Sequence, residues 1–116
     1  MKDIEFKINS TDIHPNSEIA GTISVSYPGR YDGVVINTQI LDSNEHITYK
    51  SYNGKTISNN VARLFINKDT MSENKAEFTA VIKFEPTQEY EVKFRASIIE
   101  QHKEIESQII FAKYSV

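Results

Sequence analysis

Hydrophobic and polar residues alternate one by one through much of this 116-residue chain. A period of two is typical of β-strands with one buried face, because successive side chains point to opposite sides of a sheet. Short segments rich in Gly, Pro, Asn, Asp and Ser separate the alternating stretches. We therefore predict eight strands, at about residues 4–8, 19–27, 34–41, 47–51, 61–66, 76–84, 90–98 and 105–114.

The loop between the second and third predicted strands has the strongest turn signals. Pro28-Gly29 fits a type II turn, and Asp32-Gly33 fits a second turn that uses the positive φ that glycine accepts. This loop is longer than a two-residue hairpin, so we expect the flanking strands to lie in different sheets. Residues 34–36 are all apolar, which predicts burial on both faces of the third strand.

Four local features add detail to this prediction. Gly21 lies inside a strand, where a glycine often marks a bulge or a close approach by neighbouring backbone. Asn53-Gly54 is typical of a tight turn, and residues 69–72 fit a short helical turn. Outward charges on the strands at residues 76–84 and 90–98 are expected to pair across neighbouring strands.

Together these patterns predict an all-β fold. We expect a two-sheet antiparallel β-sandwich of about 7–8 strands, arranged as one domain over residues 1–116. The length is near the commonest domain size and suffices for a hydrophobic core. No ten-residue stretch has a helical period, and the sequence shows no linker, low-complexity segment or strong internal repeat.

Composition and charge exclude several classes of function. The chain has no cysteine, so disulfides and thiolate metal sites are excluded. Its 13 basic residues are scattered and its net charge is -3, which argues against nucleic acid as a partner. No apolar run approaches the roughly 20 residues of a membrane span, so we expect no membrane insertion. The charged N-terminal segment lacks the apolar core of a signal peptide, so we expect a cytoplasmic protein.

Residues that could support catalysis or metal binding are dispersed. His14, His46 and His102 lie in separate predicted loops without a short ligand spacing, which favours exposed histidines over a metal site. Glutamates gather near residues 85–91 and 100–106, as they do at solvated hairpin ends. No nucleophile, phosphate-loop or metalloprotease motif is present, so we predict no enzyme, no cofactor and no metal. A hydrolase that uses loop carboxylates is the catalytic alternative.

Tyrosines near turns form the candidate contact surface. A tyrosine ring supplies contact area and its hydroxyl supplies a polar group. The candidate partner-binding residues are Tyr27, Arg30, Tyr31, Asp32 and Tyr52. The alternative is that tyrosines close the ends of the core. That role is favoured for Tyr27, Tyr49, Tyr90 and Tyr114, whereas both interpretations stay open for Tyr31 and Tyr52.

The sequence also resembles the arrestin family. An F-x-I strand precedes HPNSEIAGTISV, which is similar to the arrestin-type pattern of a proline-containing turn followed by V-x-G-x-V-x-V. The matching positions are Pro15, Glu18, Ile19, Gly21, Ile23 and Val25. YEVKFRASI at residues 90–98 is similar to the strand that closes the same lobe. The resemblance covers nearly the whole chain as one arrestin-like or immunoglobulin-like lobe, whereas arrestins have two lobes in tandem.

This resemblance implies a non-catalytic scaffold or adaptor that binds other proteins. We expect partners to dock on the loop at residues 27–33 or to add a strand to an exposed sheet edge, and a homodimer is one form of this interaction. A small-ligand or carbohydrate-binding β-sandwich is the alternative, with Tyr31, Tyr52 and nearby asparagines as its platform.

Overall fold

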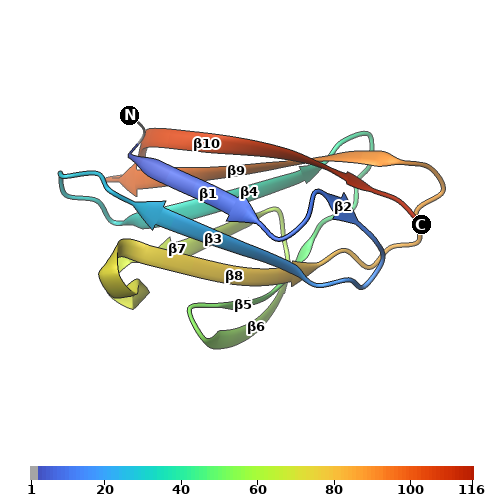
Figure 1. Ribbon diagram of the computed structural model, residues 1–116, viewed down its shortest axis with the longest axis horizontal. Coiled ribbons are helices and arrows are strands. Elements are labelled where there is room, and N and C mark those ends of the chain that lie inside the picture. Colours follow the sequence, from blue (N-terminus) through green and yellow to red (C-terminus); the bar gives the residue numbers. More distant parts are fainter. Residues whose placement is uncertain (1–2) are drawn as a thin grey trace.

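Two five-stranded sheets pack face to face in the computed structural model, which describes residues 3–116 (Figure 1). Sheet A has the strand order β1-β3-β8-β5-β6, and sheet B has the order β2-β10-β9-β4-β7. The strands are β1 (Ile4–Ile8), β2 (Asp12–Ile13), β3 (Ile19–Val25), β4 (Gly33–Ile40), β5 (Thr48–Tyr52), β6 (Lys55–Asn60), β7 (Arg63–Asn67), β8 (Lys75–Val81), β9 (Tyr90–Glu100) and β10 (Lys103–Tyr114). Two 3-10 turns, η1 (Lys68–Thr70) and η2 (Ser72–Asn74), connect β7 to β8.

The predicted β-sandwich is confirmed, and neighbouring strands are antiparallel except β2 and β10. The predicted domain also includes residues 1 and 2, which lie outside the described residues. Residues 3–116 form ten strands, two more than the sequence pattern predicts. The additional strands are β2, which has two residues, and β6, whose sequence KTISNN is almost wholly polar. Neither has an alternating apolar face, so each depends on pairing with a neighbour.

Several strands that follow each other in sequence lie in different sheets. The prediction that β3 and β4 lie in different sheets is confirmed. The expectation that β8 and β9 pair is wrong, because β8 lies between β3 and β5 whereas β9 lies between β10 and β4. The segment at residues 82–89 crosses from sheet A to sheet B. The outward charges of β8 and β9 therefore face opposite sides of the sandwich.

The core consists of the inward-facing residues of the alternating strands. On β3, for example, Ile19 and Ile23 are buried while Thr22 is exposed. Residues 34–36 of β4 are all buried, as predicted. Val35 points to the outer face of sheet B, where it lies between Phe65 of β7 and a serine of β9.

Aromatic rings fill the centre of the core. The ring centre of Phe6 lies 6.3 Å from that of Phe78 and 6.4 Å from that of Phe94. Burial of one such side chain stabilises the fold by roughly 1.5–3 kcal/mol. Gly21 makes room for the Phe78 ring, because an added Cβ would lie 2.3 Å from it. The close approach predicted at Gly21 is therefore made by a side chain.

Of the three turns predicted at glycines, one is confirmed and two are wrong. Asn53 and Gly54 have positive φ values of 46° and 82°, as the predicted tight turn requires. Gly29 and Gly33 do not have positive φ, so the two turns predicted in the β3–β4 loop are wrong. Gly33 is the first residue of β4, and an added Cβ would lie 2.2 Å from the Ile66 carbonyl oxygen. Glycine is needed there because β7 packs too closely for a side chain.

The sandwich is closed along one side and open along the other. On the closed side, side chains of β10 cover the edge of β1. The N–H of Phe6 donates to Gln108 Oε1 at 3.1 Å, and the N–H of Asp3 donates to Glu106 Oε2 at 2.7 Å. On the open side, β6 and β7 are the outermost strands, and no strand within residues 3–116 pairs with their outer edges.

A buried hydrogen-bond network joins the two sheets near this open side. The hydroxyl of Tyr49 on β5 lies 2.9 Å from Thr38 Oγ1 on β4 and 3.0 Å from the carbonyl oxygen of Ala62. The same carbonyl accepts the N–H of Thr38 at 2.8 Å. When Thr38 donates its hydroxyl to Tyr49 and Tyr49 donates to Ala62, all these groups are satisfied. Burial raises the pKa of Tyr49 far above that of a free phenol.

We expect Tyr49→Phe to lower the free energy of unfolding by about 1–3 kcal/mol, because it leaves the buried Thr38 hydroxyl without its partner. Tyr52→Phe is the matched control, since Tyr52 is half-buried on the same strand and its hydroxyl makes no hydrogen bond within residues 3–116. The control should change stability by less than about 0.5 kcal/mol. Urea unfolding at pH 7 measures both, and equal effects would contradict the network.

Candidate functional site

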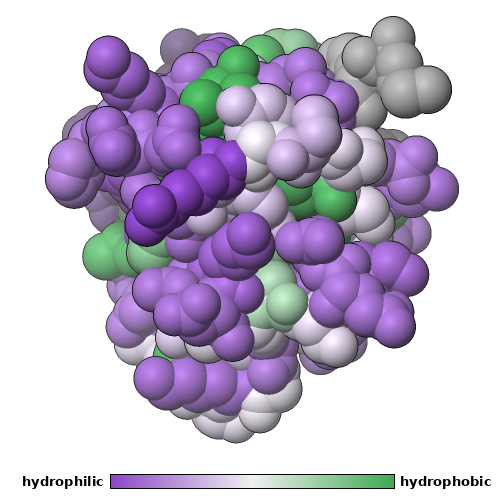
Figure 2. Space-filling view, turned by 90° about the vertical axis from the view of Figure 1, so that its left-hand side faces the viewer, coloured by the Kyte–Doolittle hydropathy of each residue, from purple (hydrophilic) through white to green (hydrophobic). Residues whose placement is uncertain are grey.

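The β3–β4 loop lies at one end of the sandwich, beside η1, η2 and the β9–β10 turn (Figure 1). Figure 2 shows this end, where hydrophilic side chains predominate and hydrophobic ones form small separate areas. Three of the five predicted contact residues come together here. They line a shallow hollow whose residues include Arg30, Tyr31, Asp32, Phe65 and Lys68.

The other two predicted contact residues lie apart from this group. The Tyr27 ring is half-buried next to Gly29, where an added Cβ would lie 2.7 Å from the ring. Tyr52 lies on β5 in sheet A, and Lys55 Nζ is 5.8 Å from the centre of its ring. A contact role for each of the five residues stays a prediction, but they do not share one surface.

Tyr31 is packed into the fold. Its side chain is only 4% exposed, and its hydroxyl donates to Asn74 Oδ1 at 2.6 Å. Lys68 Nζ lies 4.5 Å from the centre of the ring, within the range of a cation–π interaction. Burial raises the pKa of the Tyr31 hydroxyl. These contacts attach the loop to η1 and η2 and favour the structural interpretation of Tyr31 over a stacking platform.

Asp32 connects the loop to three other segments. Its N–H donates to the Ile99 carbonyl at 2.7 Å, and its own carbonyl accepts the N–H of Lys68 at 2.9 Å. Its carboxylate accepts the N–H of Gln101 at 2.7 Å. Gln101 and His102 have positive φ values of 50° and 67°, which residues with a Cβ seldom adopt. The Asp32 carboxylate therefore stabilises an otherwise unfavourable β9–β10 turn.

Phe65 is a surface residue that the sequence analysis did not identify. It lies on the outer face of sheet B and is 44% exposed. Its ring leans over Gly33, where an added Cβ would lie 2.9 Å from the ring. An open hollow of about 410 Å³ beside the ring is lined by Asp32, Arg63, Phe65, Ile99 and His102. The alternation could have revealed Phe65, because its neighbours in sequence supply the inward positions of β7.

The backbone of β7 presents hydrogen-bonding groups along this surface. The N–H of Thr38 donates to Ala62, and the N–H of Lys68 donates to Asp32, at the two ends of the β4–β7 pairing. Hydrogen-bonded and non-hydrogen-bonded pairs alternate in antiparallel strands. The odd-numbered residues 63, 65 and 67 therefore direct their N–H and C=O groups away from the sheet. Thr70 Oγ1 donates to the carbonyl of residue 67 at 2.7 Å and satisfies one of these groups.

Basic and acidic groups both line the hollows beside Phe65, and Asp32 belongs to both hollows. Arg63 and Arg95 lie in one row across sheet B, with Asn37 of β4 between them. Arg95 forms an ion pair with Glu104, which also accepts the Ser97 hydroxyl at 2.7 Å. The hydrogen bond from Arg95 holds the pKa of Glu104 below its ordinary value of 4.5, against the effect of desolvation. No salt bridge within residues 3–116 involves Arg63.

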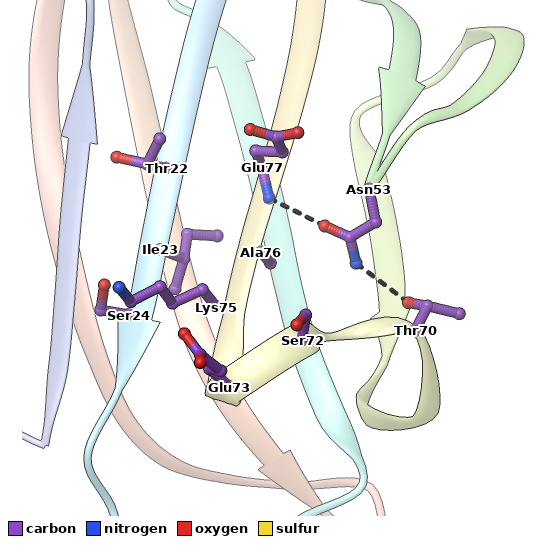
Figure 3. Close-up of a pocket in the computed structure, with 10 residues that line it drawn as sticks. All are labelled: Thr22, Ile23, Ser24, Asn53, Thr70, Ser72, Glu73, Lys75, Ala76 and Glu77. Atoms are coloured by element: carbon purple, nitrogen blue, oxygen red, sulfur yellow. Dashed lines mark hydrogen bonds between the residues drawn. The ribbon is translucent and has the colours of Figure 1, made fainter.

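A third hollow lies on the outer face of sheet A beside η2 (Figure 3). Asn53 Oδ1 accepts the N–H of Glu77 at 2.9 Å, and Asn53 Nδ2 donates to Thr70 Oγ1 at 3.0 Å. These bonds fasten the β5–β6 turn to β8 and η1 and use the polar groups of Asn53. Hydroxyls and exposed charged groups make up most of the remaining lining, which includes no aromatic ring. The aromatic platform expected for a carbohydrate is therefore absent from this hollow.

Residues 3–116 contain no group of three or more His, Cys, Asp or Glu side chains that could hold a metal ion. No helix in this part of the chain is long and apolar enough to cross a membrane.

The fold is similar to that of proteins with diverse functions. No protein-family model matches the sequence, and no curated protein matches it. The adhesin CfaE of enterotoxigenic E. coli is similar with a TM-score of 0.56 and 13% identity, over 98% of this chain and 49% of the adhesin. This chain thus spans about half the length of CfaE. The human F-spondin reeler domain has a TM-score of 0.56 and 11% identity, over 98% of this chain and 87% of that domain.

An enzyme has the same kind of fold. AvmM, which catalyses macrocyclization in alchivemycin A biosynthesis, is similar with a TM-score of 0.52 and 8% identity, over 97% of this chain and 88% of AvmM. At these identities the similarities show the β-sandwich fold alone. Because this fold occurs in an adhesin and in an enzyme, function has to be argued from the surface.

We expect Tyr31→Ala to lower the free energy of unfolding by about 3 kcal/mol, because it removes a buried ring and its hydrogen bond. Arg30→Ala changes an exposed neighbour and should alter stability by less than about 0.5 kcal/mol. Urea unfolding followed by circular dichroism compares them. A similarly small effect of both changes would contradict the structural role of Tyr31.

Stability should also depend on the ionisation of Glu104. Since its pKa is lower in the folded protein, Glu104 stabilises the fold above its ordinary pKa of 4.5, and this contribution is lost as pH falls through the folded value. Unfolding of the wild type and of Glu104→Gln should therefore differ most near pH 7 and converge as the pH falls well below 4.5. A difference that persists unchanged at low pH would rule out the ion pair as its source.

Proposed function

We propose that this protein is a non-catalytic module that binds other proteins by adding an extended segment of the partner to β7. The observation that carries this proposal is the open edge of β7, with an exposed phenylalanine beside its outward-directed backbone groups. In strand addition, main-chain hydrogen bonds provide affinity and contacts to alternate side chains provide specificity. Phe65 is the main side-chain contact in this proposal.

The other sheet edges are less suited to strand addition. The edge of β1 is covered by side chains of β10, and β2 has only two residues. Strand β6 is polar, and its pairing with β5 has an irregular register between Tyr49 and Ser51. Polar, bulged or covered edges are ways in which proteins avoid unwanted strand pairing. The edge of β7 has regular register and a large apolar side chain at its centre.

Protein binding is the class of function expected from the sequence. The main contact residue is now Phe65 of β7 instead of the residues of the β3–β4 loop. Arg30 and Asp32 of the predicted loop surface lie next to Phe65 and form the rim of the proposed site. An arrestin-type adaptor is the narrower form of the proposal, and the residue pattern of the sequence is its support. A cytoplasmic location also belongs to the proposal and is supported by the cysteine-free sequence.

We expect Phe65→Thr to weaken binding of added strands at least tenfold, because it removes the aromatic contact and keeps a residue that favours strands. Heptapeptides selected from a random display library against the immobilised protein serve as probes. Fluorescence anisotropy measures their affinity, and NMR spectra locate them. Bound peptides should shift the backbone amide signals of residues 63, 65 and 67 most.

Phe111→Thr is the matched control. Phe111 lies on β10 on the same outer face of sheet B and is 53% exposed, more than Phe65. Its substitution should leave peptide affinity within about twofold of the wild type. Selected peptides that bind both variants equally well, or that shift amides far from β7, would contradict the proposal.

A further inference from the structure

We propose that the segment bound by β7 runs antiparallel to it and carries an apolar residue followed two positions later by Asp or Glu. This inference rests on the strand addition proposed above and adds the direction and the side-chain chemistry of the partner. It follows from the register that the edge imposes and from the charge of Arg63, which takes part in no salt bridge within residues 3–116.

The outward backbone groups of β7 determine which residue of the partner strand lies opposite each residue of β7. In an antiparallel pair, the partner residue opposite Phe65 forms both main-chain hydrogen bonds with it, and its side chain lies on the same outer face. That side chain therefore lies beside the exposed ring of Phe65. An apolar or aromatic residue at this position removes the ring from water and extends the apolar surface formed with Ile99.

Arg63 determines the second position. Because side chains alternate, the next partner residue on the outer face lies two positions away, opposite Arg63. The side chain of Arg63 is exposed, and its cross-strand neighbour on β4 is the uncharged Asn37. The carboxylate of Glu104 is already paired with Arg95. A carboxylate from the partner would thus complete a cross-strand ion pair that the free protein lacks.

The direction of the strand gives the order of the two residues. An antiparallel partner passes Asn67 first, then Phe65 and then Arg63. The apolar residue therefore precedes the acidic residue, and a parallel partner would require the reverse order. Antiparallel pairing is favoured because it is slightly more stable per residue.

A second copy of this chain complements the edge less well. Antiparallel pairing of two β7 strands about Phe65 places the two phenylalanine rings together and each Arg63 opposite Asn67. Such a dimer satisfies the apolar contact and leaves Arg63 without a carboxylate. The charge of the edge therefore favours a different chain with an acidic residue.

Three capped peptides test the inference. They share flanking residues and have the centres Ser-Val-Phe-Val-Glu, Ser-Val-Phe-Val-Lys and the reversed Glu-Val-Phe-Val-Ser. NMR titration of the full chain at low salt measures their affinities for β7. We expect the first to bind about five- to tenfold more tightly than either of the others, and 0.5 M NaCl to reduce the difference. Arg63→Glu should reverse the preference between the first two peptides.

The outcomes separate this inference from the proposed function. If peptides shift the β7 amides with equal affinities for Glu and Lys, or if Arg63→Glu leaves the preference unchanged, strand addition stands and the acidic specificity is overturned. Tighter binding of the reversed peptide would overturn the antiparallel direction. If no peptide shifts β7, strand addition itself fails. Concentration-dependent shifts of β7 without peptide, together with a dimer in light scattering, would identify a second copy as the occupant and overturn the inference.

Discussion

The buried hydrogen bonds of the Tyr49 hydroxyl join sheet A to sheet B beside the edge strand β7. This hydroxyl crosses from sheet A to Thr38 on β4 and to the carbonyl of Ala62, immediately before β7. Because buried polar groups must be satisfied, these bonds hold the start of β7 against β4 and fix the position of both sheets there. On the opposite side, Gln108 and Glu106 occupy the edge of β1. The fold therefore leaves the edge of β7 accessible, beside the buried hydrogen bonds of Tyr49.

The features of this edge follow from close packing between β4 and β7. Gly33 lacks a Cβ, which allows the Ile66 carbonyl to approach and the Phe65 ring to lie across β4. The Asp32 carboxylate holds the adjacent β9–β10 turn, so the hollow beside the ring has a fixed wall. The same glycine and aspartate that looked like turn residues in the sequence thus shape the proposed binding surface. Their roles depend on contacts between segments that are distant in sequence.

The sequence predicted what depends on local alternation and missed what depends on pairing. Features that depend only on residues close in sequence could be predicted. They are the strands of the core, the buried residues 34–36 and the Asn53-Gly54 turn. The strands β2 and β6 and the separation of β8 from β9 could not, because partners elsewhere in the chain create them. Tyr31 was ambiguous because its burial depends on Asn74 and Lys68. Phe65 could be placed outward by its period, but its position on an edge strand required the sheet order.

The central claim is that β7 is an edge strand whose outward N–H groups, at residues 63, 65 and 67, pair with no strand within residues 3–116 and can bind a partner strand. Hydrogen exchange of individual amides in the dilute, unliganded protein tests this claim most directly. We expect the amides of Leu64, Ile66 and Lys68, which face β4, to exchange slowly, and those of Phe65 and Asn67 to exchange rapidly. Slow exchange of Phe65 and Asn67 under these conditions would show that the edge is already paired and would contradict the account.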